Sequence, residues 1–511
     1  MNVGSLLSWH ARYHPDRLAV VCGDERLSFG DLEIRVNQLA NALVRLGLRK
    51  GDKLALVLSN CPELLYAYRA AALLGIVAVP LSPLLRGAGL IALLRDSESI
   101  AVIASYAMAD ALDEARVELP QIVNGNYILV GDMKRSGYTV YADFVSSENA
   151  SAPASVDVTG EDLYNIVYSS GTTGSPKGIV HTHSIRAMYC TMFAGSFRIT
   201  PESVVMHAGS LVFNGAFVTL MPAWYLGCTY ILQQKFDAVE FIETVAREKV
   251  THVMMVPSQI VAVMNARNYS AKKLESLRML CSVGAPWHRE HKERLLQILP
   301  HSLYELYGLT EGFITILDSS DFASKIDSVG TPIPFSEMRI VGEDSRQLEP
   351  GEVGEITGRG PMLMPGYYNR PDLTAEAIIG GWLYTGDVGF ADVDGFLHLV
   401  DRKKDMIISG GVNVFPKDIE EIIVQHPAVR EVAVYGVPDE KWGECPVAAV
   451  ILIRPGAVDA ETLRQWTNAR VAARYQQIHE LSIMEDFPRS TAGKTLKRVL
   501  RESHANAAVP S

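Results

Sequence analysis

The clearest chemical signal in the sequence is a run of hydroxyl and glycine residues. Residues 168–178 read Tyr-Ser-Ser-Gly-Thr-Thr-Gly-Ser-Pro-Lys-Gly and follow an apolar, strand-like segment. Glycine lets backbone N–H groups approach an anion, hydroxyl groups donate to phosphate oxygens, and Lys177 adds a positive charge. The run therefore predicts a phosphate-binding loop, with a glycine- and serine-rich surface turn as the alternative. It is not a Walker A loop, because Pro176 stands where that motif requires glycine.

A second lysine follows a similar string near the C-terminus. Residues 488–495 read Pro-Arg-Ser-Thr-Ala-Gly-Lys-Thr and miss the P-loop pattern by one residue, since Pro488 replaces the first glycine. Only 16 residues follow Thr495, which is too few to build the rest of a P-loop domain. Lys494 is therefore expected to serve a site that other parts of the chain build, or no site.

The elements that must position these loops alternate between strand-like and helical patterns. Residues 31–49 place apolar side chains at helical spacing and indicate a helix. Such alternation favours an α/β architecture with largely parallel sheets. The strand candidates are the apolar runs at 54–58, 100–103, 229–232 and 252–256.

The composition of the chain changes near residue 400. A segment dense in glycine, proline and turn residues gives way to a charged run at 401–405, and a region with its own strand and helix patterns follows. We predict a mixed α/β and α+β fold in two domains. Residues 1–400 would form a large domain of packed α/β subdomains, and residues 401–511 a small α+β domain whose boundary lies at Asp401.

The overall composition excludes some function classes. The 511 residues include 47 Lys and Arg against 58 Asp and Glu, and a net charge of −11 disfavours a nucleic-acid partner. The six cysteines lack metal-ligand spacing, which indicates reduced thiols and neither disulfides nor a zinc site. The N-terminus has no signal-peptide segment, and the apolar residues 70–85 are too short to span a bilayer and are predicted to be a buried strand. We expect a cytoplasmic protein without a transmembrane segment and leave peripheral membrane contact open.

The order of the motifs along nearly the whole chain resembles the adenylate-forming superfamily, which includes acyl-CoA synthetases, luciferases and the adenylation domains of peptide synthetases. Six blocks occur in the family's order. They are residues 168–178, Gly284-Ala285-Pro286, Tyr307-Gly308-Leu309-Thr310-Glu311-Gly312, Tyr384-Thr385-Gly386-Asp387, Asp401-Arg402-Lys403-Lys404-Asp405, and Pro488 to Lys494.

The resemblance implies a nucleotide-binding role for most of these blocks. It implies that Thr310 contacts the α-phosphate of ATP and that Glu311 holds Mg²⁺, a role that suits a carboxylate. It also implies that Tyr307 stacks on adenine and that Asp387 and Arg402 contact the ribose. Taken alone, each residue has a plainer interpretation as a core, turn or surface residue. The remaining residues implied to bind ATP are Ser169, Ser170, Gly171, Thr172, Thr173, Gly174 and Lys177 in the loop, and Gly284, Ala285 and Pro286 at the second adenine wall.

The resemblance also implies a reaction in two halves. A carboxylic acid and Mg·ATP would first give acyl-AMP and pyrophosphate, with Lys494 relieving the repulsion between the two anions. Coenzyme A would then displace AMP. Gly410 and Gly411, in the loop 409–413, would line the pantetheine tunnel after the small mobile domain rotates about a hinge at Asp401.

The residues implied to line the acyl pocket are mostly apolar or small, which suits an uncharged acyl or aryl body. Asn214 stands where peptide-synthetase domains carry an aspartate for the substrate ammonium, so an α-amino acid is disfavoured. Many fatty- and aryl-acid synthetases carry histidine there, and this chain departs from them too. The candidates are Phe213, Asn214, Gly215, Phe217, Ser282, Val283, Gly284 and Leu309.

We therefore expect an AMP-forming acyl-CoA synthetase in fatty-acid metabolism. Its partners would be ATP, Mg²⁺, coenzyme A and a medium- or long-chain fatty, alicyclic or aromatic acid. The alternative is a stand-alone adenylation enzyme that loads an acid onto a carrier protein. A homodimeric assembly stays open.

Overall fold

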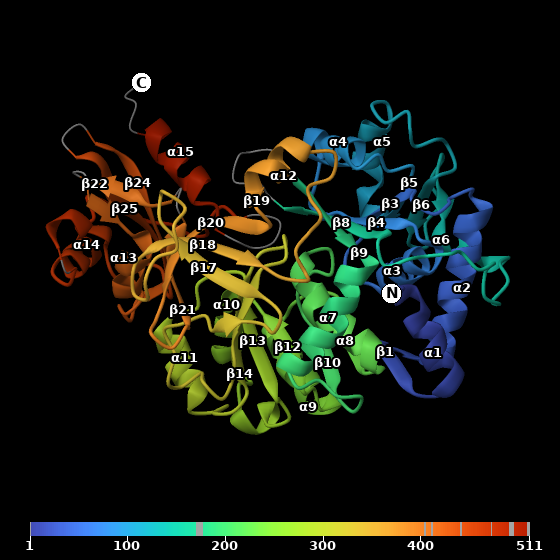
Figure 1. The fold of residues 1–511 in the computed structure, drawn as a ribbon, viewed down its shortest axis with the longest axis horizontal. Coiled ribbons are helices and arrows are strands. Elements are labelled where there is room, and N and C mark those ends of the chain that lie inside the picture. The colour runs from blue at the N-terminus through green and yellow to red at the C-terminus, as the bar shows by residue number, and fades with distance from the viewer. Residues whose placement is uncertain are drawn as a thin grey trace.

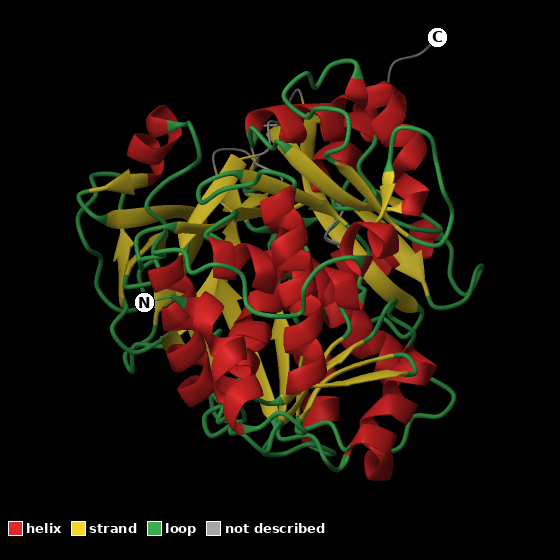
Figure 2. Ribbon diagram, turned by 90° about the vertical axis from the view of Figure 1, so that its right-hand side faces the viewer, coloured by secondary structure: helices red, strands yellow, loops and turns green. Residues whose placement is uncertain are grey.

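The large domain consists of two mainly parallel sheets with helices between and outside them (Figures 1 and 2). The structure is a computed structural model that describes residues 2–169, 177–402, 405–409, 412–439, 442–471, 473–489 and 495–507. Only the backbone is described for Arg402, Asn413 and residues 505–507.

The larger sheet has nine strands in the order β16-β15-β14-β13-β12-β10-β11-β1-β2. Neighbours from β14 to β1 run parallel, and the antiparallel strands β15, β16 and β2 lie at its margins. The structure confirms the strands expected at 229–232 and 252–256. The bounds are β1 (Leu18–Cys22), β2 (Glu25–Ser28), β10 (Val204–His207), β11 (Thr229–Leu232), β12 (His252–Met255), β13 (Met279–Val283), β14 (Leu303–Gly308), β15 (Ile314–Leu317) and β16 (Thr331–Pro332).

The second sheet has seven strands in the order β7-β6-β5-β3-β4-β8-β9. All neighbours are parallel except β8 and β9, which form an antiparallel hairpin. The strands expected at 54–58 and 100–103 are confirmed as β3 and β5. The bounds are β3 (Lys53–Val57), β4 (Val77–Pro80), β5 (Ala101–Ser105), β6 (Tyr127–Val130), β7 (Thr139–Val140), β8 (Leu163–Ser169) and β9 (Lys177–Thr182).

The prediction that residues 70–85 form a buried strand is wrong for most of that stretch, because only β4, residues 77–80, is a strand. Its first residues end the helix α3 (Pro62–Leu74), and Gly75, with φ of 67°, terminates the helix before β4 begins. Both elements are buried on nearly every side. An apolar run without polar positions carries no periodicity, so helix and strand cannot be told apart from it.

Helices form three layers around the two sheets. The middle layer shares one hydrophobic core with both sheets, and the outer helices pack on either sheet's other face. The helix expected at 31–49 is confirmed in the middle layer, and a capping box between Ser28 and Asp31 starts it. The middle helices are α2 (Phe29–Arg45), α3, α7 (His183–Ser196) and α8 (Asn214–Leu226), with α4 (Gly87–Asp96) and α5 (Ala109–Arg116) outside the seven-stranded sheet and α9 (Ala238–Glu248), α10 (Pro257–Met264) and α11 (Arg289–Leu296) outside the nine-stranded sheet. Shorter helices include α1 (Leu6–Tyr13), α6 (Tyr141–Ser146) and α12 (Pro371–Ala377).

A five-stranded antiparallel sheet completes the large part of the chain, and a separate sheet builds the small C-terminal domain. Side chains alternate along β24: Val434 packs toward α13 and α14, whereas Ala433 and Tyr435 pack with Leu500 of α15 on the other face. The five-stranded sheet of the large part of the chain has β17 (Glu337–Val341), β18 (Gly354–Arg359), β19 (Ile378–Ile379), β20 (Trp382–Ala391) and β21 (Leu397–Arg402). The small domain has β22 (Ile407–Ser409), β23 (Val412–Val414), β24 (Val429–Asp439), β25 (Gly443–Leu452), β26 (Glu480–Ile483), α13 (Pro416–Ile423), α14 (Ala460–Asn468) and α15 (Lys497–Ala507).

Polar contacts join the small domain to the large one. The Glu421 carboxylate lies 3.1 Å from Nδ1 of His288, and Lys417 Nζ donates to the Leu399 carbonyl at 2.8 Å. The mixed fold with a large N-terminal and a small C-terminal domain is thus as expected. The boundary at Asp401 stays a prediction.

The six cysteines are free thiols. Parallel pairing of β25 with β26 brings Cys445 and His479 close to Asp439, and one ligand atom from each lies within 4.8 Å of the others. The sequence spacing did not indicate this group. Within the described part of the chain, no helix combines the length and apolar character that a membrane span requires.

Candidate active site

Predicted site residues from three separate segments meet at one edge of the nine-stranded sheet. The strands β10, β13 and β14 are parallel, so their carboxyl ends lie together. The segments that follow them carry Asn214, the exposed turn 284–286, and the pair Thr310 and Glu311. This edge is where open parallel sheets bind their ligands.

Thr310 and Glu311 lie at the tip of the hairpin between β14 and β15. The Leu309 amide donates to the Phe313 carbonyl at 3.0 Å, which closes the hairpin. Gly312 has φ of 114°, and a Cβ atom there would lie 2.0 Å from the Met362 carbonyl oxygen. Only glycine therefore lets the tip pack against residue 362 and holds Glu311 in place.

Glu311 and Lys177 meet around a tyrosine that the sequence analysis missed. Tyr367 donates its hydroxyl proton to Glu311 Oε1 at 2.9 Å, and Lys177 Nζ lies 4.9 Å from the centre of the Tyr367 ring. Burial, and then the Glu311 charge, raise the pKa of Tyr367, so the hydroxyl stays a donor. Segment 366–368 is held there because it pairs with β9 through Ile179 and Gly178.

The predicted adenine and ribose residues also contact one another. The Tyr307 hydroxyl donates to Asp387 Oδ2 at 2.8 Å, and Asp387 is 8% exposed. Asp387 follows Gly386, whose φ of 70° turns the chain within β20, and it pairs across β20 and β21 with Arg402. Two blocks 80 residues apart in sequence thus form one polar group.

A buried relay supports the backbone at Thr310. Nε2 of His181 lies 2.8 Å from the Thr310 carbonyl oxygen, and Arg186 Nη2 lies 3.2 Å from His181 Nδ1. Arg186 also binds Asn165 Oδ1 through Nε at 3.3 Å and Nη2 at 3.0 Å. Burial, and then Arg186, lower the pKa of His181 well below its ordinary value. The imidazole is therefore neutral, with Nδ1 accepting from Arg186 and Nε2–H donating to Thr310.

Four of the predicted acyl residues, Phe213, Asn214, Gly215 and Phe217, lie at the start of α8. Asn214 begins this helix, and its Nδ2 donates to the Tyr189 hydroxyl at 3.2 Å. Phe217 is fully buried. Its ring is edge-on to the Tyr68 ring, with 5.2 Å between the ring centres, and Arg186 Cζ lies 4.2 Å from the centre of the Phe217 ring. Phe213, Gly215, Val283 and Leu309 are partly buried.

Several predicted residues lie outside the described part of the chain. Ser169 and Lys177 pair across β8 and β9 at the two ends of the predicted phosphate loop. The residues not described are Ser170, Gly171, Thr172, Thr173 and Gly174 of that loop, Gly410 and Gly411 of the small domain, and Lys494.

Comparison with known proteins gives full-length matches. The family model described as AMP-binding enzyme matches residues 7–368, and the model described as AMP-binding enzyme C-terminal domain matches residues 418–494. The chain is 33% identical over 517 residues to long-chain-fatty-acid–CoA ligase FadD13 of Mycobacterium tuberculosis, covering 100% of this chain and 99% of that protein. It is 33% identical over 512 residues to feruloyl-CoA synthase of Amycolatopsis sp, covering 98% and 99%.

A solved structure supports the same relationship. The anthranilate CoA ligase AuaEII, crystallised in complex with anthranoyl-AMP, matches with a TM-score of 0.92 and 25% identity, covering 99% of this chain and 98% of that chain. The similarity therefore extends over both domains.

Proposed function

The chain belongs to the AMP-binding enzyme family, and from that premise we propose that it converts a carboxylic acid to its acyl-CoA thioester through an acyl-adenylate. The observation that carries the proposal is the meeting of Lys177, Tyr367 and Glu311 beside Thr310. A cation, a hydroxyl donor and a carboxylate at one edge suit a bound triphosphate and its metal ion. The named CoA ligases among its relatives make the chain an ATP-dependent acid–thiol ligase.

The first half-reaction joins the acid to the α-phosphate of ATP. A carboxylate oxygen attacks the α-phosphorus, the bond to the bridging oxygen breaks, and pyrophosphate leaves. Lys177 lies at the end of the phosphate loop and offsets charge on the leaving group. Thr310, held by His181, offers its hydroxyl to the α-phosphate, and Lys494 would offset the charge between the two reacting anions.

Glu311 is the residue that would hold Mg²⁺. Carboxylate oxygen is a ligand that Mg²⁺ prefers, and this ion usually keeps several waters and binds phosphate oxygens besides one or two carboxylates. When bound, it would neutralise charge on the phosphates. The hydroxyl of Tyr367 keeps the Glu311 carboxylate oriented for that role.

Tyr307 and Asp387 would bind the nucleoside. Tyr307 lies near the end of β14, and the neighbouring strand β13 leads into the exposed turn 284–286. Adenine would lie between the Tyr307 ring and that turn. The buried Asp387 carboxylate accepts from Tyr307 and would accept from the ribose hydroxyls as well.

In the second half-reaction, the thiolate of coenzyme A attacks the acyl carbon and AMP leaves. We infer that the domain of residues 401–511 rotates about Asp401 so that Lys494 serves the first step and the 409–413 loop the second. The acid would be a fatty, alicyclic or aromatic one, in line with the range of acids in the relatives' names. The cytoplasmic location, the role in fatty-acid metabolism and a homodimer stay predictions.

The experiment that tests the activity is pyrophosphate release over a panel of acids, with and without coenzyme A. We expect acid-dependent release that coenzyme A accelerates. Release that coenzyme A does not accelerate would favour the carrier-protein alternative. No acid-dependent release from any acid would refute the activity.

The two-step scheme has its own test. We expect Lys494→Ala to block pyrophosphate release but to leave thioester formation from supplied acyl-AMP largely intact. Equal loss of both steps would contradict rotation of the small domain.

A further inference from the structure

Arg186 is a fully buried cation whose hydrogen bonds are incomplete. A guanidinium has five N–H donors. Nε uses one toward Asn165, and Nη2 uses two, toward Asn165 and His181. The two donors of Nη1 are buried and have no partner among the described residues. Nε and Nη2 share the edge of the guanidinium that faces Asn165 and His181, so Nη1 points away from these two residues.

The charge of Arg186 is also uncompensated. No ion pair of Arg186 occurs in the part of the chain that the structure describes, and its polar partners are a neutral amide and a neutral imidazole. The aromatic faces of Phe217 and Tyr189, at 4.2 and 4.8 Å from Cζ, attract the cation but leave its donors unused. Buried charges are normally paired, because an unpaired charge loses its hydration without replacement.

The guanidinium of Arg186 packs against a predicted acyl-pocket residue, Phe217. Phe217 and Asn214 of α8 are two of the pocket candidates. Arg186 packs on the Phe217 ring and on the Tyr189 ring, and the Tyr189 hydroxyl accepts from Asn214. Asn214 is 8% exposed, and its side-chain oxygen is likewise buried, with no partner in the part of the chain that the structure describes. Two residues with buried, unsatisfied polar atoms, Arg186 and Asn214, thus both contact Tyr189 and lie among the predicted acyl-pocket residues.

We propose that Arg186 binds a second carboxylate on the body of the substrate, so that the enzyme activates dicarboxylic acids in preference to monocarboxylic acids. The inference rests on the proposed function and on the predicted pocket. One carboxylate of the acid would face the α-phosphate, and the other would accept from Nη1 of Arg186. This differs from the uncharged acyl body that the sequence alone suggests.

The first test uses the unmodified full-length protein and matched pairs of acids. Adipate and hexanoate, suberate and octanoate, and terephthalate and 4-methylbenzoate differ in one carboxylate. We expect at least one diacid to exceed its partner by about 10-fold or more in kcat/KM for pyrophosphate release, because a site with buried donors rejects an analogue that lacks the acceptor. Every monoacid exceeding its diacid would overturn the inference. No turnover with any acid would instead refute the proposed function.

The second test separates recognition from support of the fold. In Arg186→Met, we expect kcat/KM for the preferred diacid to fall about 100-fold. We expect kcat/KM for the matched monoacid to fall by a smaller factor, because both acids lose the support that Arg186 gives to His181 and Thr310. An equal fall for both acids would show that Arg186 acts only through His181 and Thr310, and would overturn the inference.

Arg69 provides the matched control. It is 6% exposed and stacks on Trp224, with Cζ 4.0 Å from the ring centre, near the opposite end of α8 from Asn214. Arg69→Met removes a second buried cation, and we expect the diacid-to-monoacid ratio to stay unchanged. If Arg186→Met does not fold, Arg186→Lys replaces it. We expect its diacid-to-monoacid ratio of kcat/KM to lie between 1 and the ratio of the unmodified protein. An unchanged ratio in Arg186→Lys would count against the inference.

Discussion

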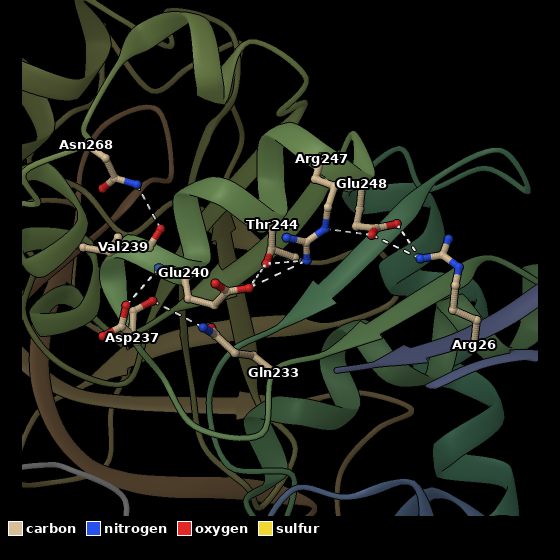
Figure 3. A network of polar contacts seen from close by, with 9 residues as sticks. All are labelled: Arg26, Gln233, Asp237, Val239, Glu240, Thr244, Arg247, Glu248 and Asn268. Atoms are coloured by element: carbon tan, nitrogen blue, oxygen red, sulfur yellow. Dashed lines mark hydrogen bonds and ion pairs between the residues drawn. The ribbon is translucent and has the colours of Figure 1, made fainter. Parts of the chain in front are cut away.

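Two polar clusters of this protein differ in how their arginines are paired. On the outer face of the nine-stranded sheet, Arg26 of β2 and Arg247 of α9 both contact Glu248, at 3.1 Å each (Figure 3). The same network continues through Thr244 to Glu240. Around α7, Arg186 has neutral hydrogen-bond partners, and two of its donors find no partner among the described residues.

This difference distinguishes arginines that the fold itself pairs, Arg26 and Arg247, from Arg186, for which we propose a ligand. Arg26 and Arg247 are about half exposed, and water and carboxylates satisfy them without help from another molecule. Such pairs contribute little to stability, about 0–1 kcal/mol each. Arg186 and Asn214 are buried and carry polar atoms without partners among the described residues, whereas Glu311 and Lys177 both contact Tyr367, where ATP is expected. The buried polar groups without partners are therefore the more informative ones about function.

The largest expected effect is on Glu311. We expect Glu311→Gln to lower kcat for acid-dependent pyrophosphate release by about 10²–10³-fold, because a neutral amide stabilises Mg²⁺ and the phosphates poorly. Glu248→Gln makes the same chemical change in the surface network and serves as the control. Equal losses in the two variants would break the distinction between the clusters.

The next effect is a loss of stability in acid. Burial lowers the pKa of His183 and of His207 to about 4. The unfolded chain therefore binds more protons than the folded chain below pH 6.5, and stability falls as the pH drops from about 6.5 toward 4. Each residue contributes up to about 1.4 kcal/mol per pH unit in that window.

Urea unfolding at several pH values measures this loss. We expect His207→Gln to flatten the dependence of the unfolding free energy on pH between 7 and 5. Glu248→Gln should leave that slope unchanged. A slope that His207→Gln does not alter would show that this imidazole is not buried in its neutral form.

A smaller effect is expected for Tyr367. Tyr367→Phe keeps the ring beneath Lys177 but removes the hydrogen bond to Glu311, and one such bond to a charged group contributes about 1.5–3 kcal/mol. We expect roughly a 10-fold fall in kcat and a higher Mg²⁺ concentration for half-maximal rate. A change in stability with an unaltered Mg²⁺ dependence would assign Tyr367 to packing alone.

The smallest effect is expected in the surface network. Arg26→Met breaks the contact between β2 and α9, and we expect the unfolding free energy to change by less than about 1 kcal/mol. The difference in unfolding free energy between Arg26→Met and the unmodified protein should be smaller in 0.5 M NaCl, because salt screens exposed charges. A larger loss that salt does not reduce would mean that this network contributes more to stability than an exposed ion pair does.

Much of the candidate site could be predicted from the sequence because its motifs are local strings. The predicted phosphate loop, the pair Thr310 and Glu311, and the Gly386–Asp387 turn each occupy consecutive residues. Several strands and the helix at 31–49 were predicted for the same reason, since their periodicity lies within one segment. The contact between Tyr307 and Asp387 was not predicted, because no local pattern encodes the pairing of two distant strands.

What the sequence by itself determined is the family, the order of the motifs and the alternation of helices and strands. Only the tertiary structure decided which residues support those motifs. Tyr367 reaches Glu311 because segment 366–368 pairs with β9, and Arg186 lies above Phe217 because α7 packs on α8. An isolated tyrosine or arginine has no recognisable pattern in sequence. Its role depends on burial and on partners far along the chain, and only the folded structure brings these together.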